Sequence, residues 1–217
     1  MGWRRQCKAR TFVRAVRYAA GMENGSTAVA PPTRRAATTR EAILRRAVDL
    51  ASVEGLEGLT IGRLASETGM SKSGLFRHFG SKQELQLATV DAASERFIAE
   101  VVEPALKEGE GAPRLRALCE RYLDHLESAV FSGGCFWAET SSEFDGRPGP
   151  VRDKVREAVR AWVDGLAELA RVAGAEDPDQ LAFELHSVAQ GANQRFQLFG
   201  DEDAFARARA TFERLLP

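Results

Sequence analysis

The sequence is poor in cysteine, and it lacks any long apolar run. Its three cysteines, Cys7, Cys119 and Cys135, include no C-x-x-C pair, so neither a disulfide framework nor a zinc ribbon is predicted. No uncharged stretch approaches the ~18–20 apolar residues that a helix needs to span a bilayer. These absences favour a reducing, cytoplasmic setting and predict no membrane partner.

Motifs of catalysis and of metal binding are also missing. The chain has no G-x-S-x-G elbow, no H-E-x-x-H pair and no glycine-rich phosphate loop of the P-loop form. Its three histidines are scattered. We therefore expect no catalytic residues, no metal site and no cofactor, and an enzyme is the least favoured class of function.

Alternation of apolar and polar residues, the pattern of a half-buried strand, is absent, and helical spacing occurs throughout. The charges are unevenly distributed along the chain. Residues 1–82 carry 15 Lys and Arg against 6 Asp and Glu, a net charge of +9, whereas residues 83–217 carry 15 against 25, a net charge of −10. An all-α protein with an anionic partner for its basic first third is predicted.

Composition divides the chain into three segments. Residues 1–33 are expected to be a disordered basic leader and linker, because residues 21–33 are small and rich in Gly, Pro and Ser. An alternative is translation from a start upstream of the usual one, with Met22 as the usual start. Residues 34–82 and 83–217 are then expected to form two helical domains.

The predicted helices follow from caps and glycine stops. A capping box at Thr38 opens the first helix, which Gly55 and Gly58 end. Thr60 caps a second, short helix that Gly69 stops, and Ser71 caps a third that Gly80 stops. Further helices are predicted at 81–108, 113–131, 135–144, 150–173, 177–199 and 201–215, which gives about nine in total.

The second and third helices, joined by a tight glycine turn, have the form of a helix-turn-helix unit. The second helix of such a unit, here the one that Ser71 caps, enters the DNA major groove with its N-terminal residues at the base edges. Ser71, Lys72 and Ser73 lie at that end. Gly74 would let the backbone approach DNA closely. Because helix N-termini attract phosphate, Thr60 and Lys82 are candidate phosphate contacts.

The stretch TIGRLASETGMSKSGLFRHFGSKQEL (residues 60–85) resembles the DNA-binding motif of the TetR family of bacterial transcriptional regulators, and the resemblance covers residues 38–85. It implies DNA contacts at six positions, which are Thr60, Ser71, Lys72, Ser73, His78 and Lys82. Phe76 departs from the tyrosine that the family often has, which removes a phosphate hydrogen bond but leaves van der Waals contact to DNA.

The resemblance further implies a repressor that binds a palindromic operator as a dimer and responds to a small ligand. The dimer would form through helices 177–199 and 201–215. Apolar faces on these helices are compatible with that role, and an intrachain core could use the same residues: Leu181, Leu185, Val188, Ala189, Ala192 and Phe196, then Phe205, Phe212 and Leu215. The ligand itself is not identified by the sequence.

Candidate residues for the ligand pocket are aromatic, apolar and polar side chains on core-facing turns. They are Cys119, Tyr122, Leu126, Phe136, Trp137, Thr140, Trp162, His186, Gln190 and Asn193. Three of them, His186, Gln190 and Asn193, form a polar stripe on an apolar helix, which fits either pocket chemistry or a hydrogen-bonded dimer seam. A thiol-based redox sensor using Cys119 or Cys135 is the alternative function, although no basic group is placed near either thiol.

Overall fold

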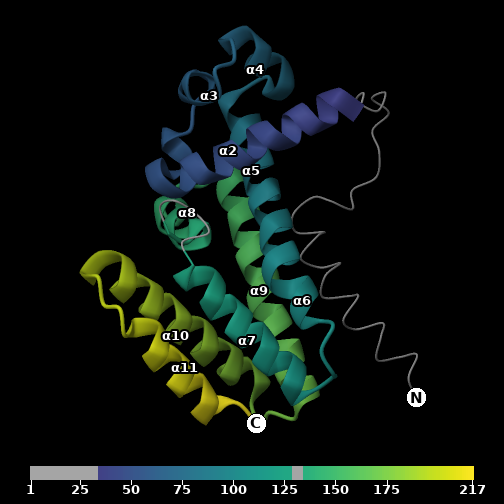
Figure 1. The fold of residues 1–217 in the computed structure, drawn as a ribbon, viewed down its shortest axis with the longest axis vertical. Helices are drawn as coiled ribbons and strands as arrows, with labels where there is room; N and C mark the ends of the chain where they lie inside the picture. Colours follow the sequence, from purple (N-terminus) through teal and green to yellow (C-terminus); the bar gives the residue numbers. More distant parts are fainter. Residues whose placement is uncertain (1–33, 129–133) are drawn as a thin grey trace. The chain divides into compact units, whose positions relative to one another are not determined.

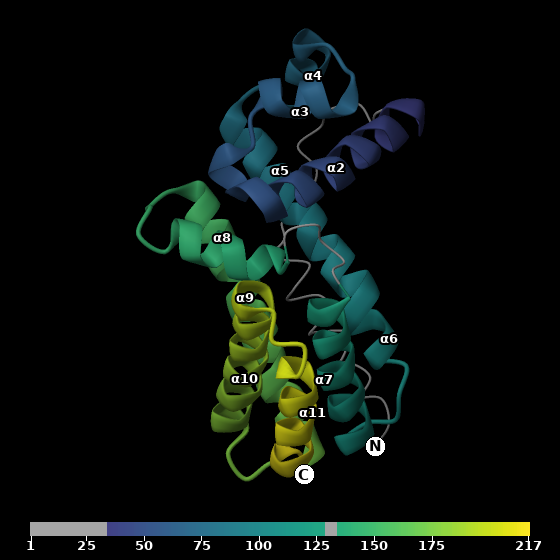
Figure 2. The same ribbon diagram turned by 60° about the vertical axis from the view of Figure 1, so that its left-hand side comes forward.

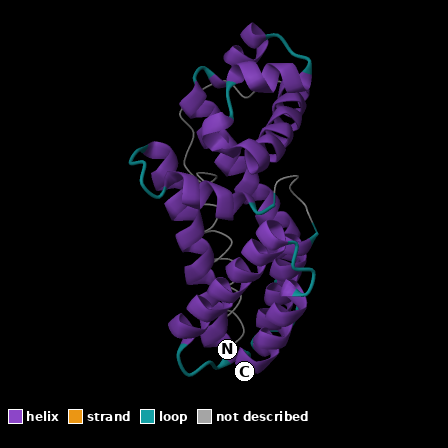
Figure 3. Cartoon of the chain, turned by 90° about the vertical axis from the view of Figure 1, so that its left-hand side faces the viewer, coloured by secondary structure: helices purple, strands orange, loops and turns teal. Residues whose placement is uncertain are grey.

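The computed structural model describes residues 34–128 and 134–217, so the expectations for residues 1–33 lie outside the described part. Within these two ranges every regular element is a helix and no strand occurs (Figure 3). The all-α prediction is confirmed. None of the described helices has both the length and the apolar character required to cross a membrane.

The described residues form two compact units. The N-terminal unit consists of residues 34–95 and 134–157, and the C-terminal unit consists of residues 96–128 and 158–217. Two long helices, α5 (Lys82–Phe97) and α9 (Pro150–Ala173), contribute residues to both units.

The N-terminal unit contains α2 (Arg34–Gly58), α3 (Ile61–Thr68), α4 (Lys72–Phe79), most of α5 and α8 (Phe136–Phe144). Helix α2 packs against α3 and α8, and α3 packs against α4 (Figure 1). Its core is formed by side chains with no exposed surface: Leu56, Leu59, Leu64, Leu75, Leu85 and Phe136. Burying each such side chain stabilises the unit by about 1.5–3 kcal/mol.

The first helix differs from the prediction at its start. Helix α2 begins at Arg34 and not at the capping box of Thr38. Arginine and alanine are good helix formers and precede Thr38 without a breaker, so the helix extends backwards through them. At its other end the predicted stop is confirmed, because Gly55 takes the non-helical φ 74° and ψ 163° and the last helical residue is Gly58.

The C-terminal unit contains α7 (Ala112–Glu127), the later part of α9, α10 (Pro178–Phe199) and α11 (Ala204–Leu215). Helix α10 runs beside α11, and both pack against α7 (Figures 1 and 2). The core side chains include Leu115, Leu118, Leu166, Leu185, Phe205 and Phe212. On the surface, the Arg209 guanidinium of α11 lies 2.7 Å from both the Asp124 and Glu127 carboxylates of α7.

The predicted helix 81–108 is interrupted. Helix α5 ends at Phe97, a π-helical turn covers Ile98–Val102, and the short α6 spans Glu103–Ala105. Pro104 has no N–H to donate, and its ring would clash with the carbonyl four residues earlier. The Glu103 N–H instead donates to the carbonyl of Ile98, five residues back, which widens the turn before the proline.

Candidate nucleic-acid interface

The predicted helix-turn-helix caps are confirmed. The Thr60 hydroxyl accepts a hydrogen bond from the Arg63 N–H at 3.0 Å, and the Ser71 hydroxyl accepts one from the Gly74 N–H at 3.1 Å. Between the two helices, Gly69 takes the left-handed φ of 67°, a conformation that glycine adopts without steric cost. Two short helices therefore start at fixed hydroxyl-capped positions.

The start of α4 presents its polar side chains to solvent. Ser71, Lys72 and Ser73 are all exposed, and the Ser71 and Ser73 hydroxyl oxygens lie 3.3 Å apart. The capping hydroxyls of Thr60 and Ser71 use an oxygen lone pair to hold the helix, while the O–H remains a donor. The same groups that fix α3 and α4 can therefore also donate to an anion.

Lys72 joins the starts of the two helices. A Cβ placed on Gly62 of α3 would lie 3.5 Å from the Lys72 Cε and 3.7 Å from its Nζ. The lysine side chain thus lies over the first turn of α3, where the helix dipole and the free N–H groups attract anions. A positive side chain and a helix N-terminus lie close together here, which strengthens the attraction for phosphate.

Gly74 and Phe76 lie on the same short helix with different surroundings. A Cβ on Gly74 would lie 3.1 Å from the Ser71 hydroxyl oxygen, so glycine leaves room for the cap as well as for an approaching partner. Phe76 keeps 56% of its surface exposed. A phenylalanine this exposed contributes little to the core, which leaves its ring free for apolar contact with a partner.

Two other candidates, His78 in the last turn of α4 and Lys82 at the start of α5, are less free. The Lys82 ammonium lies 2.6 Å from the Glu57 carboxylate, and this hydrogen bond is the main reason that the pKa of Glu57 is lowered. His78 is half-buried, and its ring centroid lies 6.2 Å from that of Phe79. Lys82 must exchange its carboxylate partner for a phosphate if it contacts DNA through its ammonium.

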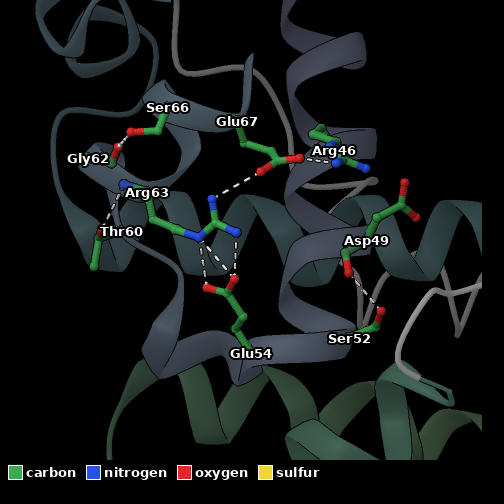
Figure 4. Close-up of polar contacts among 9 residues, drawn as sticks. All are labelled: Arg46, Asp49, Ser52, Glu54, Thr60, Gly62, Arg63, Ser66 and Glu67. Atoms are coloured by element: carbon green, nitrogen blue, oxygen red, sulfur yellow. Dashed lines mark hydrogen bonds and ion pairs between the residues drawn. The ribbon is translucent and has the colours of Figure 1, made fainter. Parts of the chain in front are cut away.

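An ion-pair network between α2 and α3 was not predicted from the sequence (Figure 4). The Arg63 guanidinium binds the Glu54 carboxylate at 2.7 Å and the Glu67 carboxylate at 3.0 Å, and Arg46 pairs with the same Glu67. Hydrogen bonds from Arg46 lower the pKa of Glu67, and the bond to Glu54 raises the pKa of Arg63. Only the i, i+4 spacing of Arg63 and Glu67 was visible in the sequence.

The polar stripe of α10 faces α7 within the same chain. The Gln190 side-chain N–H donates to the Tyr122 hydroxyl at 2.8 Å, and the His186 Nδ1 lies 3.4 Å from that oxygen. The Trp162 ring packs beside Tyr122 at 4.8 Å and beside Phe97 at 4.9 Å between centroids. Four of the predicted pocket residues, Tyr122, Trp162, His186 and Gln190, therefore lie together. Phe97, which the sequence had not indicated, packs beside Trp162.

The other predicted pocket residues are divided between the units. Cys119, Leu126 and Asn193 are buried in the C-terminal unit, whereas Phe136, Trp137 and Thr140 belong to the N-terminal unit. The Thr140 hydroxyl donates to the carbonyl of Phe136 at 2.8 Å. Within the described residues, the Trp162 Nε1 and the Asn193 Oδ1 are buried without a hydrogen-bond partner, so each can still bind a complementary group.

Burial shifts the pKa values of two candidate residues in the C-terminal unit. Loss of solvation lowers the pKa of His186 and raises the pKa of the Cys119 thiol to about 12. The imidazole is thus neutral, and the thiol is protonated, at neutral pH. No three His, Cys, Asp or Glu side chains in the described ranges are grouped in a way that could hold a metal ion.

The fold and the exposed start of α4 define a helix-turn-helix regulator with an additional helical domain. Two family models match the chain: "Bacterial regulatory proteins, tetR family" over residues 43–89, and "Tetracyclin repressor-like, C-terminal domain" over residues 111–212. The chain belongs to the TetR family of DNA-binding transcriptional regulators.

The curated relatives that match are named as HTH-type transcriptional regulators. The chain is 34% identical to the HTH-type transcriptional regulator TcmR of Streptomyces glaucescens over 73 residues, which are 33% of this chain and about a third (32%) of TcmR. It is 27% identical to the HTH-type transcriptional regulator LmrA of Bacillus subtilis over 144 residues, or 64% of this chain and 74% of LmrA.

Solved structures share the fold. A TetR regulator from Chloroflexus aurantiacus matches with a TM-score of 0.74 and 24% identity, covering 85% of this chain and 98% of that one. AibR, solved in complex with isovaleryl coenzyme A and operator DNA, matches with a TM-score of 0.67 and 22% identity, covering 82% and 98%. At this identity the likeness shows the fold alone.

Proposed function

We propose that the protein is a ligand-responsive repressor that binds a palindromic operator as a homodimer. In this proposal residues 34–82 bind DNA and residues 83–217 bind the effector and the second subunit. The observation that carries it is the exposed start of α4, where Ser71, Lys72 and Ser73 project donors into solvent from a rigidly capped helix.

We assign different roles to the DNA-contacting side chains. Lys72 and Ser73 are placed to read base edges, because the N-terminal residues of a recognition helix reach them. Thr60, Ser71, His78 and Lys82 are assigned to phosphate, which fixes the register on the duplex without reading sequence. Phe76 is assigned to apolar contact with a thymine methyl group, and Gly74 lets the backbone approach.

The dimer is assigned to α10 and α11, with a revised contact face. Most of the apolar residues predicted for the interface, including Leu185, Ala189 and Phe205, are buried within their own chain. A different face of α10 is exposed at helical spacing and comprises Phe183, Ser187, Gly191, Gln194 and Leu198. Phe183 and Leu198 keep 64% and 68% of their surface exposed, which supports a partner helix on this face.

The effector is assigned to the surroundings of Tyr122 in the C-terminal unit. His186 and Gln190 lie at its hydroxyl, and Trp162 packs against its ring. The buried Trp162 N–H lacks an acceptor within the described residues. A ligand bound there would act only if it preferred the DNA-incompetent state. AibR, a structural neighbour, was solved with both a ligand and operator DNA, which supports one protein binding both.

Footprinting tests the proposal. The full chain is used to select a DNA site from a random-sequence library, and the selected duplex is then probed by hydroxyl-radical cleavage. A dimer should protect two symmetric half-sites separated by about one helical turn, ~34–36 Å. Protection of a single asymmetric half-site, or selection of no DNA sequence at all, would overturn the dimeric operator-binding function.

A further inference from the structure

Helix α2 contains a break that a side chain from α8 covers. Gly55 takes φ 74° and ψ 163°, a region of backbone space that is essentially restricted to glycine. The two N–H groups that follow the break, those of Leu56 and Glu57, need acceptors outside their own short turn. They donate to the two carboxylate oxygens of Glu143 at 2.7 and 2.9 Å.

The same segment is held from α5. The Gln86 side-chain N–H donates to the Leu56 carbonyl at 2.8 Å, and Gln86 is itself 5% exposed. Leu56 has no exposed surface, so water does not replace either partner. In the connection between α2 and α3, the N–H groups are therefore bonded to a side chain of α8 and the Leu56 carbonyl to a side chain of α5.

The fit of the Glu143 carboxylate is close. A Cβ on Gly55 would lie 2.8 Å from the Glu143 Oε1, a distance that real Cβ atoms essentially never show, and 3.0 Å from its Cδ. Gly55 is thus required twice, once for its backbone angles and once to let the carboxylate reach the chain. The backbone conformation of Gly55 and the two hydrogen bonds to Glu143 together fix how the carboxylate lies against the chain.

Two proposed phosphate contacts are attached to this clamped segment. Thr60, the cap of α3, follows Glu57 by three residues, and the Glu57 side chain holds the Lys82 ammonium at 2.6 Å. A shift of the Glu57 backbone would therefore change both the start of α3 and the position of the α5 lysine. Helix α8 contributes no residue to the DNA-contacting face, so it can affect that face only through such contacts.

We propose that Glu143 is a positioning residue for DNA binding, whose carboxylate fixes the α2–α3 connection and thereby places Thr60 and Lys82 for phosphate. This inference rests on the DNA-binding function proposed above. A shift of α8 that withdraws the carboxylate leaves the buried Leu56 N–H without an acceptor and releases the connection. The state of α8 is in this way linked to the geometry of the phosphate contacts.

The test compares E143Q with E139Q, a matched change at an exposed glutamate four residues earlier on α8. A glutamine at position 143 keeps one acceptor oxygen but replaces the other with a donor, so one N–H of the connection loses its partner. Affinity for the library-selected duplex is measured by fluorescence anisotropy at several salt concentrations, with the full chain. E143Q should bind about tenfold more weakly, the loss that corresponds to one hydrogen bond to a charged group, and E139Q should bind like the wild type.

Two further readouts separate positioning from a purely structural role. If Lys82 loses its phosphate contact in E143Q, the slope of log affinity against log salt should fall by about 1, as it should in K82Q. In the double variant E143Q/K82Q the two losses should be less than additive, because they share one contact. Equal affinity of E143Q and wild type, an unchanged slope, or full additivity with K82Q would each overturn the proposal.

The design also keeps the two proposals apart. A wild-type chain that binds no DNA refutes the proposed function, whereas a wild type that binds normally beside an unaffected E143Q refutes only the positioning role. If E143Q unfolds by circular dichroism, E143D keeps the charge but shortens the reach and is assayed in the same way. Unfolding of both variants would assign Glu143 to stability alone and overturn the inference.

Discussion

The two units hold their functional side chains by different means. In the N-terminal unit the ion pairs are at least partly exposed: Arg63 bridges Glu54 and Glu67 between α2 and α3, and Lys82 pairs with Glu57. In the C-terminal unit the contacts around Tyr122 are at least partly buried and involve uncharged groups, such as the Gln190 amide and the Tyr122 hydroxyl. Ionised groups are costly to bury, whereas hydrogen-bonded neutral groups are not.

This difference matches the partners that the two units are proposed to bind. Exposed ion pairs are weak, about 0–1 kcal/mol each, so a lysine such as Lys82 can exchange a carboxylate for a phosphate at little cost. Buried neutral groups instead favour an uncharged or fully hydrogen-bonded ligand. Two groups show the contrast: a hydrogen bond from Lys82 lowers the pKa of Glu57, and loss of solvation lowers the pKa of His186.

The largest expected effect is on the stability of the N-terminal unit. Gly55→Ala should lower the free energy of unfolding by about 2–3 kcal/mol, because alanine is strained at the backbone angles of Gly55 and its Cβ would displace the Glu143 carboxylate. Urea denaturation followed by circular dichroism measures the change. Gly146→Ala is the control, since Gly146 has open space around it. Equal stabilities of the two variants would show that the break in α2 is not built around glycine.

The next effect is on DNA affinity alone. Lys72→Ala should weaken binding to the selected duplex by about 1–3 kcal/mol and relax preference at one base pair, if Lys72 reads a base. If it binds phosphate, the loss should be uniform across DNA sequences. Lys107→Ala, at an exposed lysine of the C-terminal unit, should leave affinity unchanged. A loss below a few tenths of a kcal/mol would remove Lys72 from the interface and weaken the contrast between the units.

Much of the fold could be predicted because caps and glycine stops are local signals. Thr60 and Ser71 were identified as caps from residue type and spacing, and each accepts the expected backbone N–H. Local signals also misled. The capping box at Thr38 lies within a helix that begins at Arg34, because a box marks a helix start only where the preceding residues do not continue the helix.

The candidate site was predictable to the extent that it is contiguous in sequence. Ser71, Lys72 and Ser73 adjoin one another, so one motif identifies them. Glu143 contacts an N–H group 87 residues earlier in the chain, and no spacing rule relates positions so far apart. The Glu57 partner of Lys82 was missed for the same reason. The sequence left open whether the apolar residues of α10 form a dimer face or an intrachain core, and packing buries most of them, such as Leu185 and Ala189, within their own chain.

A pH titration should distinguish the buried polar groups of the C-terminal unit from the exposed ion pairs. Burial lowers the pKa of His186, so the unfolded chain binds a proton before the folded chain does as pH falls below the ordinary histidine value of about 6.5. The free energy of unfolding should therefore keep its full value above that pH and decrease below it. His186→Asn does not titrate there and should show a shallower decrease, with the remainder from His125, whose pKa is also lowered by burial. An unchanged slope would place His186 in contact with water.

The smallest expected effect is that peroxide leaves DNA affinity unchanged. Each unit contains one described thiol, Cys135 in the N-terminal unit and Cys119 in the C-terminal unit. Cys119 and Cys135 are both buried, and burial raises the pKa of Cys119 to about 12. Because the thiolate is the reactive form, peroxide should not oxidise Cys119 at neutral pH, and the buried Cys135 should be protected by its lack of exposure. A Cys7→Ser chain treated with peroxide should keep its DNA affinity by anisotropy, and peptide mass spectrometry should find no oxygen added at Cys119 or Cys135. The redox alternative would be established if sulfenic acid formed at either position, DNA binding was lost, and a Cys→Ser change at that position prevented the loss. The neutral interior would then be an oxidant sensor and not a ligand site.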